Sequence, residues 1–160
     1  LNEPRLTRYL RDFGRDGASF VDPKSVGQIS EGLSYIYARG ESLTDTAKSA
    51  ALRHLEGVII KAYDWANKNP AAWIDAYYVK NQNVTADDGW RILRSTGTTG
   101  FPKLDDALIA RQQGTIDVLD KAGQLPKKVK ASDDFDLRFA PVIEQAVSET
   151  GISRGSEKIQ

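Results

Sequence analysis

The sequence predicts a helix-rich α/β chain with one clear strand and four to five helices. The strand is indicated by Leu33 to Ala38, where aromatic and β-branched residues are concentrated shortly before Gly40. The helices are indicated by apolar residues at three- and four-residue spacing through most of the remaining chain. Because a lone strand leaves its backbone N–H and C=O groups without partners, we expect the sheet to continue elsewhere, either in the early segment or in chain outside this sequence.

The composition is that of an ordinary globular protein, with 40% hydrophobic and 28% charged residues. The 22 basic and 22 acidic residues balance, so nucleic acid and anionic membranes are poor candidate partners. No apolar run approaches the roughly 20 residues of a membrane-spanning helix. We expect any export signal to lie outside this chain, because its first residues resemble no signal peptide. Without cysteine, disulfides and thiolate metal sites are excluded.

The first forty residues are predicted to hold a short element followed by a loop. Apolar residues at helical spacing end at Phe13, and Gly14, Gly17 and Pro23 interrupt any longer helix. A long helix is predicted from Thr46 to Asn69, with Asp45 as its N-cap.

A second helix is predicted to begin at Pro70, since proline suits the first helical turn. It carries an aromatic stripe of Trp73, Tyr77 and Tyr78, which we assign to the core, although such a stripe could also stack on a ligand.

Capping residues predict the remaining helices. Thr85 begins a third helix, and Asp105 with Asp106 begins a fourth that ends at Gly123. A last apolar cluster runs from Phe135 to Ile143. Residues 148–160 are polar and are predicted to form a disordered tail.

The loop Ser95-Thr96-Gly97-Thr98-Thr99-Gly100-Phe101-Pro102-Lys103 resembles the phosphate-binding loop of acyl-adenylate-forming enzymes. Such a loop turns backbone N–H groups and hydroxyls toward the phosphates of ATP, and a lysine adds charge. In that family the loop follows an apolar strand, whereas here it follows a predicted helix. We therefore favour a turn between two helices, in which glycine supplies positive φ, over a nucleotide site.

No catalytic or metal-binding arrangement is evident in the sequence. His54 is the only histidine, and its neighbours Arg53 and Glu56 form neither a nucleophile set nor a metal-ligand set. The sequence therefore predicts a protein that is not an enzyme and needs no cofactor or metal.

The segment from Gly32 to Phe139 resembles the solute-binding proteins of ABC importers, of the aliphatic-sulfonate (nitrate, sulfonate and taurine) type. The resemblance is carried by the order of several short motifs: Tyr63-Asp64-Trp65-Ala66-Asn67-Lys68-Asn69-Pro70, Pro102-Lys103-Leu104-Asp105-Asp106-Ala107, Arg111-Gln112-Gln113 with Asp117, and Ala122-Gly123-Gln124-Leu125-Pro126-Lys127 with Val129.

The resemblance implies that residues 1–147 are the C-terminal portion of a two-lobed receptor with a type 2 periplasmic-binding-protein-like fold. Its ligand would be a small anion such as an alkanesulfonate, and its partner the membrane permease of an ABC importer. The location would be periplasmic or on the cell surface. Because ligand contacts both lobes only when they meet, binding would favour the closed state.

A sulfonate is bound by N–H groups and by hydroxyl or arginine donors. The segment next to the expected cleft supplies the candidate ligand-binding residues Ser30, Glu31, Gly32, Leu33 and Ser34. Of these residues, Glu31 is a poor direct partner for an anion because its carboxylate is also negative.

Two alternatives remain open. One is a nucleotide-binding fragment that uses the 95–103 loop, and the other is a helical interaction module. We also expect that an exposed lobe surface could pair two copies as a homodimer.

Overall fold

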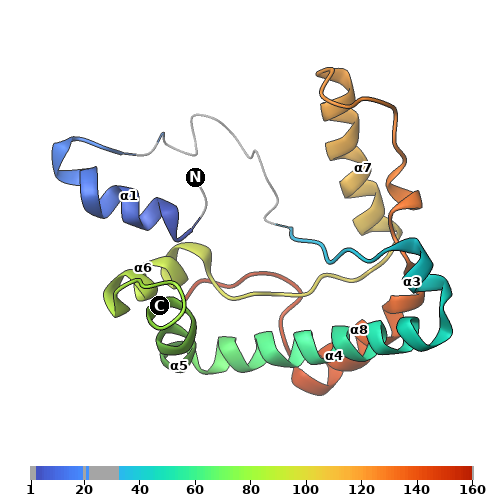
Figure 1. Cartoon of the computed structure of the whole chain (residues 1–160), viewed down its shortest axis with the longest axis horizontal. Helices are drawn as coiled ribbons and strands as arrows, with labels where there is room; N and C mark the ends of the chain where they lie inside the picture. The colour runs from blue at the N-terminus through green and yellow to red at the C-terminus, as the bar shows by residue number, and fades with distance from the viewer. Residues whose placement is uncertain (1–2, 20, 22–32, 160) are drawn as a thin grey trace. The chain divides into compact units, whose positions relative to one another are not determined.

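The computed structural model describes residues 3–19, 21 and 33–159, and every regular element within them is helical (Figure 1). No helix in this part of the chain is both long enough and apolar enough to cross a membrane. The chain divides into two compact units. The first comprises Leu1–Ser49, Asn69–Gly97 and Lys158–Gln160, and the second comprises Ala50–Lys68 and Thr98–Glu157.

The predicted α/β class with one clear strand is wrong for the described residues. Residues 33–39 form neither strand nor helix. Their side chains are largely in solvent, with Ile36 59% and Tyr37 81% exposed. Aromatic and β-branched residues favour a strand only when they pack on a pleated surface beside a hydrogen-bonding partner, and no described segment provides one here.

The first unit contains short helices. They are α1 (Arg5–Phe13), η1 (Gly14–Asp16), α3 (Gly40–Thr44), α5 (Pro70–Trp73), the π-helix η2 (Ile74–Val79) and α6 (Ala86–Thr96). The helix α6 contacts both α1 and η2. Ile74, Val84 and Ile92 are buried in this unit. A Cβ atom on Gly89 would lie 2.7 Å from Cγ2 of Ile74, so only glycine lets α6 approach η2 this closely.

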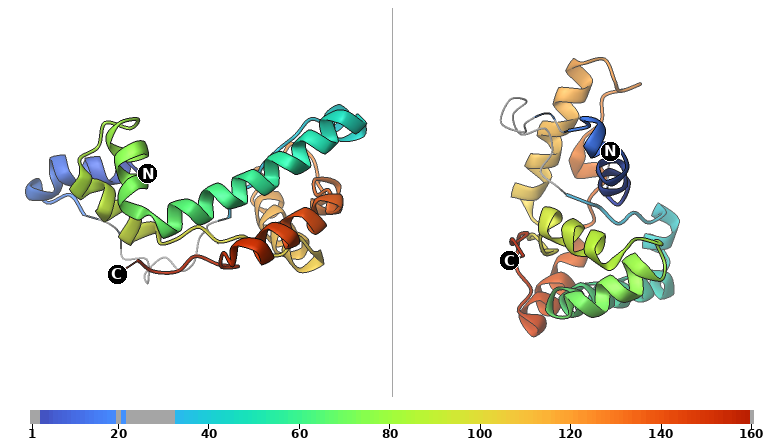
Figure 2. Two further views of the ribbon diagram at one scale, coloured as in Figure 1. Left: turned by 90° about the horizontal axis from the view of Figure 1, so that it is seen from below. Right: turned by 90° about the vertical axis from the view of Figure 1, so that its left-hand side faces the viewer.

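The second unit is built on residues 50–68 of the long helix α4 (Thr46–Lys68) and on α8 (Ala140–Thr150), which run side by side (Figure 2). It also contains α7 (Asp106–Lys121) and the short helices η3 (Ala131–Asp133) and η4 (Leu137–Phe139). Its buried core consists of Ile60, Ala146, Val147 and Ile152, with Phe101 and Ile143 packed against it.

A second apolar face of α4 lies in solvent. Leu55, Val58 and Trp65 are 47%, 47% and 48% exposed. They follow one another at three- and seven-residue intervals, so they lie along one side of the helix, away from buried Ile60. The buried face of this helix, which contains Ile60, is therefore only part of its apolar surface.

The predicted helix ends agree closely with the structure. The side-chain oxygens of Asp45, Thr85 and Asp105 accept hydrogen bonds from the N–H groups three residues later, at 2.9, 3.1 and 3.1 Å. Gly123 follows α7 with φ +68°, a conformation that suits glycine. These capping contacts involve only neighbouring residues, so the sequence alone is enough to predict them.

Residues 151–157 pack onto the second unit, although the sequence predicts a disordered tail from residue 148. The helix α8 continues to Thr150, and Ile152 is 6% exposed. The Phe101 N–H group donates to the Ser153 carbonyl at 2.9 Å, and the Thr98 N–H group donates to the Glu157 carbonyl at 2.8 Å. These contacts use backbone atoms, so the polar side-chain composition of the tail does not predict them.

Candidate functional site

The segment predicted to bind ligand is described only in part. Ser30, Glu31 and Gly32 lie outside the described residues. Leu33 is half-buried and Ser34 is exposed, and neither belongs to a helix or a strand. The structure therefore leaves the expected contact of this segment with an anion as a prediction.

The 95–103 loop uses its backbone donors within the protein. Ser95 and Thr96 are the last residues of the helix α6, so the loop continues from a helix and not from a strand. The Gly97 N–H group donates to the Leu93 carbonyl, and those of Thr98 and Phe101 donate to residues 157 and 153. The Thr99 N–H group donates to Oδ1 of Asn67 at 3.0 Å. Because these donors already have acceptors, the described conformation has the hydrogen bonds of a structural turn, not of a phosphate cradle.

Two glycines allow this loop to meet the C-terminal segment. A Cβ atom on Gly100 would lie 2.4 Å from the backbone carbon and oxygen of Gly155. No side chain fits in that space, since real Cβ contacts are never so short. The predicted role of glycine as a source of positive φ holds at Gly97, with φ +75°, whereas Gly100 is needed for close backbone approach.

Side chains from two of the motifs that carry the family resemblance bind neighbouring segments of the second unit. Asn67, from the first motif, also donates through Nδ2 to the Thr99 carbonyl at 2.8 Å. Gln113, from the third, accepts from the Ala131 N–H group at 2.8 Å and donates to Asp117 at 2.8 Å. These side chains hold the segments before and after α7 in place, so their described role is structural.

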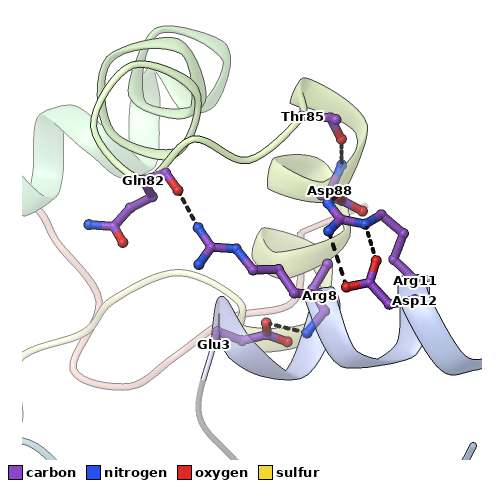
Figure 3. Close-up of polar contacts among 8 residues, drawn as sticks. Glu3, Arg8, Arg11, Asp12, Gln82, Thr85 and Asp88 are labelled. Carbon is purple, nitrogen blue, oxygen red and sulfur yellow. Dashed lines mark hydrogen bonds and ion pairs between the residues drawn. The ribbon is translucent and has the colours of Figure 1, made fainter.

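In the first unit, a polar cluster joins α1 to α6 (Figure 3). Arg11 contacts Asp12 at 2.9 Å and Asp88 at 3.2 Å. The pKa of Arg11 is raised, chiefly by its hydrogen bond to Asp12. Asp88 is buried, and its backbone N–H group donates to Oγ1 of Thr85, the N-cap residue of α6. Arg11 therefore balances a buried carboxylate and holds α1 against the start of α6.

A second arginine of α1 has a different kind of partner. Arg8 donates through Nη2 to the main-chain carbonyl of Gln82, and it is half-buried (Figure 3). Arg5, one turn earlier, is exposed. Neither arginine is among the residues predicted to bind ligand, although the arginines at 5, 8 and 11 follow a three-residue interval that places them on one side of a helix.

A shallow hollow of about 460 Å³ lies beside this helix and is lined by Tyr9, Phe13, Asp16, Gly17 and Ala18. Among these lining residues the charged one is the carboxylate Asp16, which repels an anion. The hollow is therefore a poor match for a sulfonate.

The remaining candidate groups form no reactive arrangement in the described part of the chain. His54 is exposed on α4. Residues 3–19, 21 and 33–159 contain no cluster of three or more histidine, aspartate or glutamate side chains that could hold a metal ion. Of the aromatic stripe, Trp73 and Tyr77 stack with centroids 4.6 Å apart, but Tyr77 is 37% exposed, so the predicted core position holds only in part.

No protein-family model, curated protein or solved structure matches this chain.

Proposed function

We propose that this chain is part of an extracytoplasmic receptor that binds a small sulfonate-like anion and delivers it to an ABC permease. The observation that carries the proposal is the order of sulfonate-receptor motifs between Gly32 and Phe139. Asn67 and Gln113, which belong to two of these motifs, bind backbone groups of Thr99 and Ala131 within the second unit.

The proposal concerns binding and does not depend on a strand within this chain. The described residues are all-helical, so the chain supplies helices and loops to a larger receptor. In such a receptor, donors from two lobes surround the anion, and the closed state is favoured because only that state makes both sets of contacts. This chain by itself is then expected to bind weakly.

Isothermal titration calorimetry tests the proposal. Ethanesulfonate and taurine are titrated into this chain and into a receptor chain that includes the N-terminal lobe, with acetate as the control anion. We expect sulfonate binding in the longer chain and an affinity lower by about a hundredfold or more in this one, a loss of at least about 2.7 kcal/mol. Equal affinities in the two chains, or no sulfonate binding by the longer chain, would contradict the proposal.

A helical interaction module is the second candidate function, favoured by the exposed apolar side of α4. Leu55, Val58 and Trp65 present that side to solvent, and we propose a second copy of the chain as its occupant. Three half-exposed side chains supply much less than the roughly 800 Å² per partner of a stable interface. The expected homodimer is therefore weak and is populated only at high concentration.

Sedimentation velocity over a concentration series tests this second candidate. Val58→Glu should abolish any dimer, because it places a charge in the middle of the exposed face. Val118→Glu is the matched control, since Val118 is 68% exposed on a different helix, α7. A monomer at all concentrations, or equal effects of the two variants, would contradict association through α4.

A further inference from the structure

Arg8 is a half-buried cation whose described partner carries no charge. Its Nη2 donates to the main-chain carbonyl of Gln82 (Figure 3), and it forms no ion pair with any carboxylate of the described residues. Arg11, Arg138 and Arg154 each contact a carboxylate, at 2.9, 2.6 and 2.6 Å. Arg8 therefore differs from them, since no carboxylate of residues 3–19, 21 and 33–159 pairs with it.

The Arg8 guanidinium therefore has a positive charge and further N–H donors that can bind an anion. A guanidinium has five N–H donors in a planar fork, of which the Gln82 carbonyl occupies one side. Partial burial of a cation without a counter-charge costs free energy, and an anion brought next to it recovers part of that cost. The Gln82 carbonyl also fixes the direction of the guanidinium, so the fork is already oriented before an anion arrives.

Arg5 extends the same cationic surface. It lies three residues before Arg8 in α1, and side chains at this spacing are neighbours on a helix. It is exposed and has no acceptor among the described residues. The acidic residue nearest in sequence, Glu3, accepts a hydrogen bond from the Thr7 N–H group at 3.1 Å through Oε2. Arg5 and Arg8 thus lie on one side of α1, and both have donors that no described residue accepts.

We infer that Arg5 and Arg8 bind the oxyanion of the ligand, an inference that rests on the proposed function and names a site for it. A sulfonate has three equivalent oxygens and one negative charge, so it can accept from two guanidinium groups at once. Arg8 supplies the oriented fork and Arg5 a second, more mobile cation. Lysine would not replace Arg8 fully, because an ammonium group lacks the planar fork.

The test is an NMR titration that observes the assigned arginine Nε–H groups of the chain. Sodium methanesulfonate is added while sodium chloride is reduced, so that ionic strength stays constant. We expect saturable shifts at Arg5 and Arg8 and none at Arg15, which is exposed in η1 and serves as the internal control. Arg8→Gln should weaken binding about tenfold or more, Arg8→Lys by less, and Arg15→Gln not at all.

The outcomes separate this inference from the proposed function. If methanesulfonate and sulfate leave the Arg8 signal unchanged, the inference is overturned, even where calorimetry detects sulfonate binding elsewhere. If sulfate and phosphate shift Arg8 as strongly as methanesulfonate, the site stands, while a dedicated sulfonate receptor is contradicted. Should Arg8→Gln fail to fold, Arg5→Gln replaces it, because Arg5 is exposed and no described contact is lost. An unchanged affinity in Arg5→Gln would then count against the pair.

Discussion

Asn67 uses its side-chain amide to pair with both backbone polar groups of Thr99, accepting from the N–H group at 3.0 Å and donating to the carbonyl at 2.8 Å. The amide group thus takes the place of a neighbouring backbone. The two bonds fasten the loop after α6 to the end of α4, within the second unit. They also explain why an asparagine stands at this point of the motif Tyr63 to Pro70.

Asn67→Ala is expected to reduce the free energy of unfolding by about 1 to 3 kcal/mol, because both Thr99 groups lose their partner in a partly buried place. Asn67→Asp is the matched control, since it keeps an acceptor for the N–H group but has no donor for the carbonyl. Its loss should be smaller than that of the alanine variant. Urea unfolding measures both, and an alanine variant as stable as the wild type would show that the pair contributes nothing.

Gly100→Ala should detach residues 153–157, since its Cβ atom would lie 2.4 Å from the Gly155 backbone. We expect a loss of about 1 to 3 kcal/mol and faster hydrogen exchange at the Phe101 amide, which donates to Ser153. Gly114→Ala is the control, because nothing lies within 4 Å of its Cβ position in α7. That helical substitution should stabilise the chain by about 0.5 to 1 kcal/mol. Unchanged exchange at Phe101 in Gly100→Ala would refute the close approach.

Ile60→Ala and Val58→Ala compare the two apolar faces of α4. Ile60 is 0% exposed and Val58 is 47% exposed. Removing buried methyl groups leaves a cavity, so Ile60→Ala should cost about 2 to 5 kcal/mol. The cost of Val58→Ala should stay within about 0.5 kcal/mol at low protein concentration. Chemical denaturation of the two variants checks the difference, and similar losses would mean that the described faces of α4 are wrongly assigned.

Glu56→Gln should change how stability depends on pH. Burial raises the pKa of Glu56 above its ordinary 4.5. The pKa of Glu56 is higher in the folded than in the unfolded state. The stabilising contribution of protonated Glu56 is therefore fully present below pH 4.5 and is lost as pH rises through the folded-state pKa. The glutamine variant should lack this loss, and at neutral pH it should be more stable by up to about 0.5 kcal/mol.

Glu149→Gln is the control of opposite sign. The hydrogen bond from Lys61 is the main cause that lowers the pKa of Glu149. The contribution of ionised Glu149 to stability is therefore present at neutral pH and is lost on acidification. Urea midpoints measured from about pH 3 to about pH 8 compare the two variants with the wild type. A neutral-pH loss of stability in Glu56→Gln would contradict the burial of that carboxyl group.

The sequence by itself determined where α4, α6 and α7 begin and where α7 ends. Asp45, Thr85, Asp105 and Gly123 act through atoms a few residues away, so their roles can be predicted without a tertiary structure. The same is true of the turn at Gly97, since φ is a local property. The family resemblance also came from sequence alone, and it remains the basis of the proposed function.

Only the tertiary structure decided what depends on partners distant in sequence. Residues 33–39 have the composition of a strand, yet they form none in the described chain because no neighbouring strand satisfies their backbone. The loop after α6 resembles a phosphate-binding loop in sequence. In the structure its backbone N–H groups donate to Asn67 and to residues 153 and 157 instead. Whether Arg8 meets a carboxylate likewise depends on which groups surround it, and among the described residues its partner is the Gln82 carbonyl. Hydrogen bonds, burial and ion pairs between remote segments are created by folding, and a local pattern does not specify them.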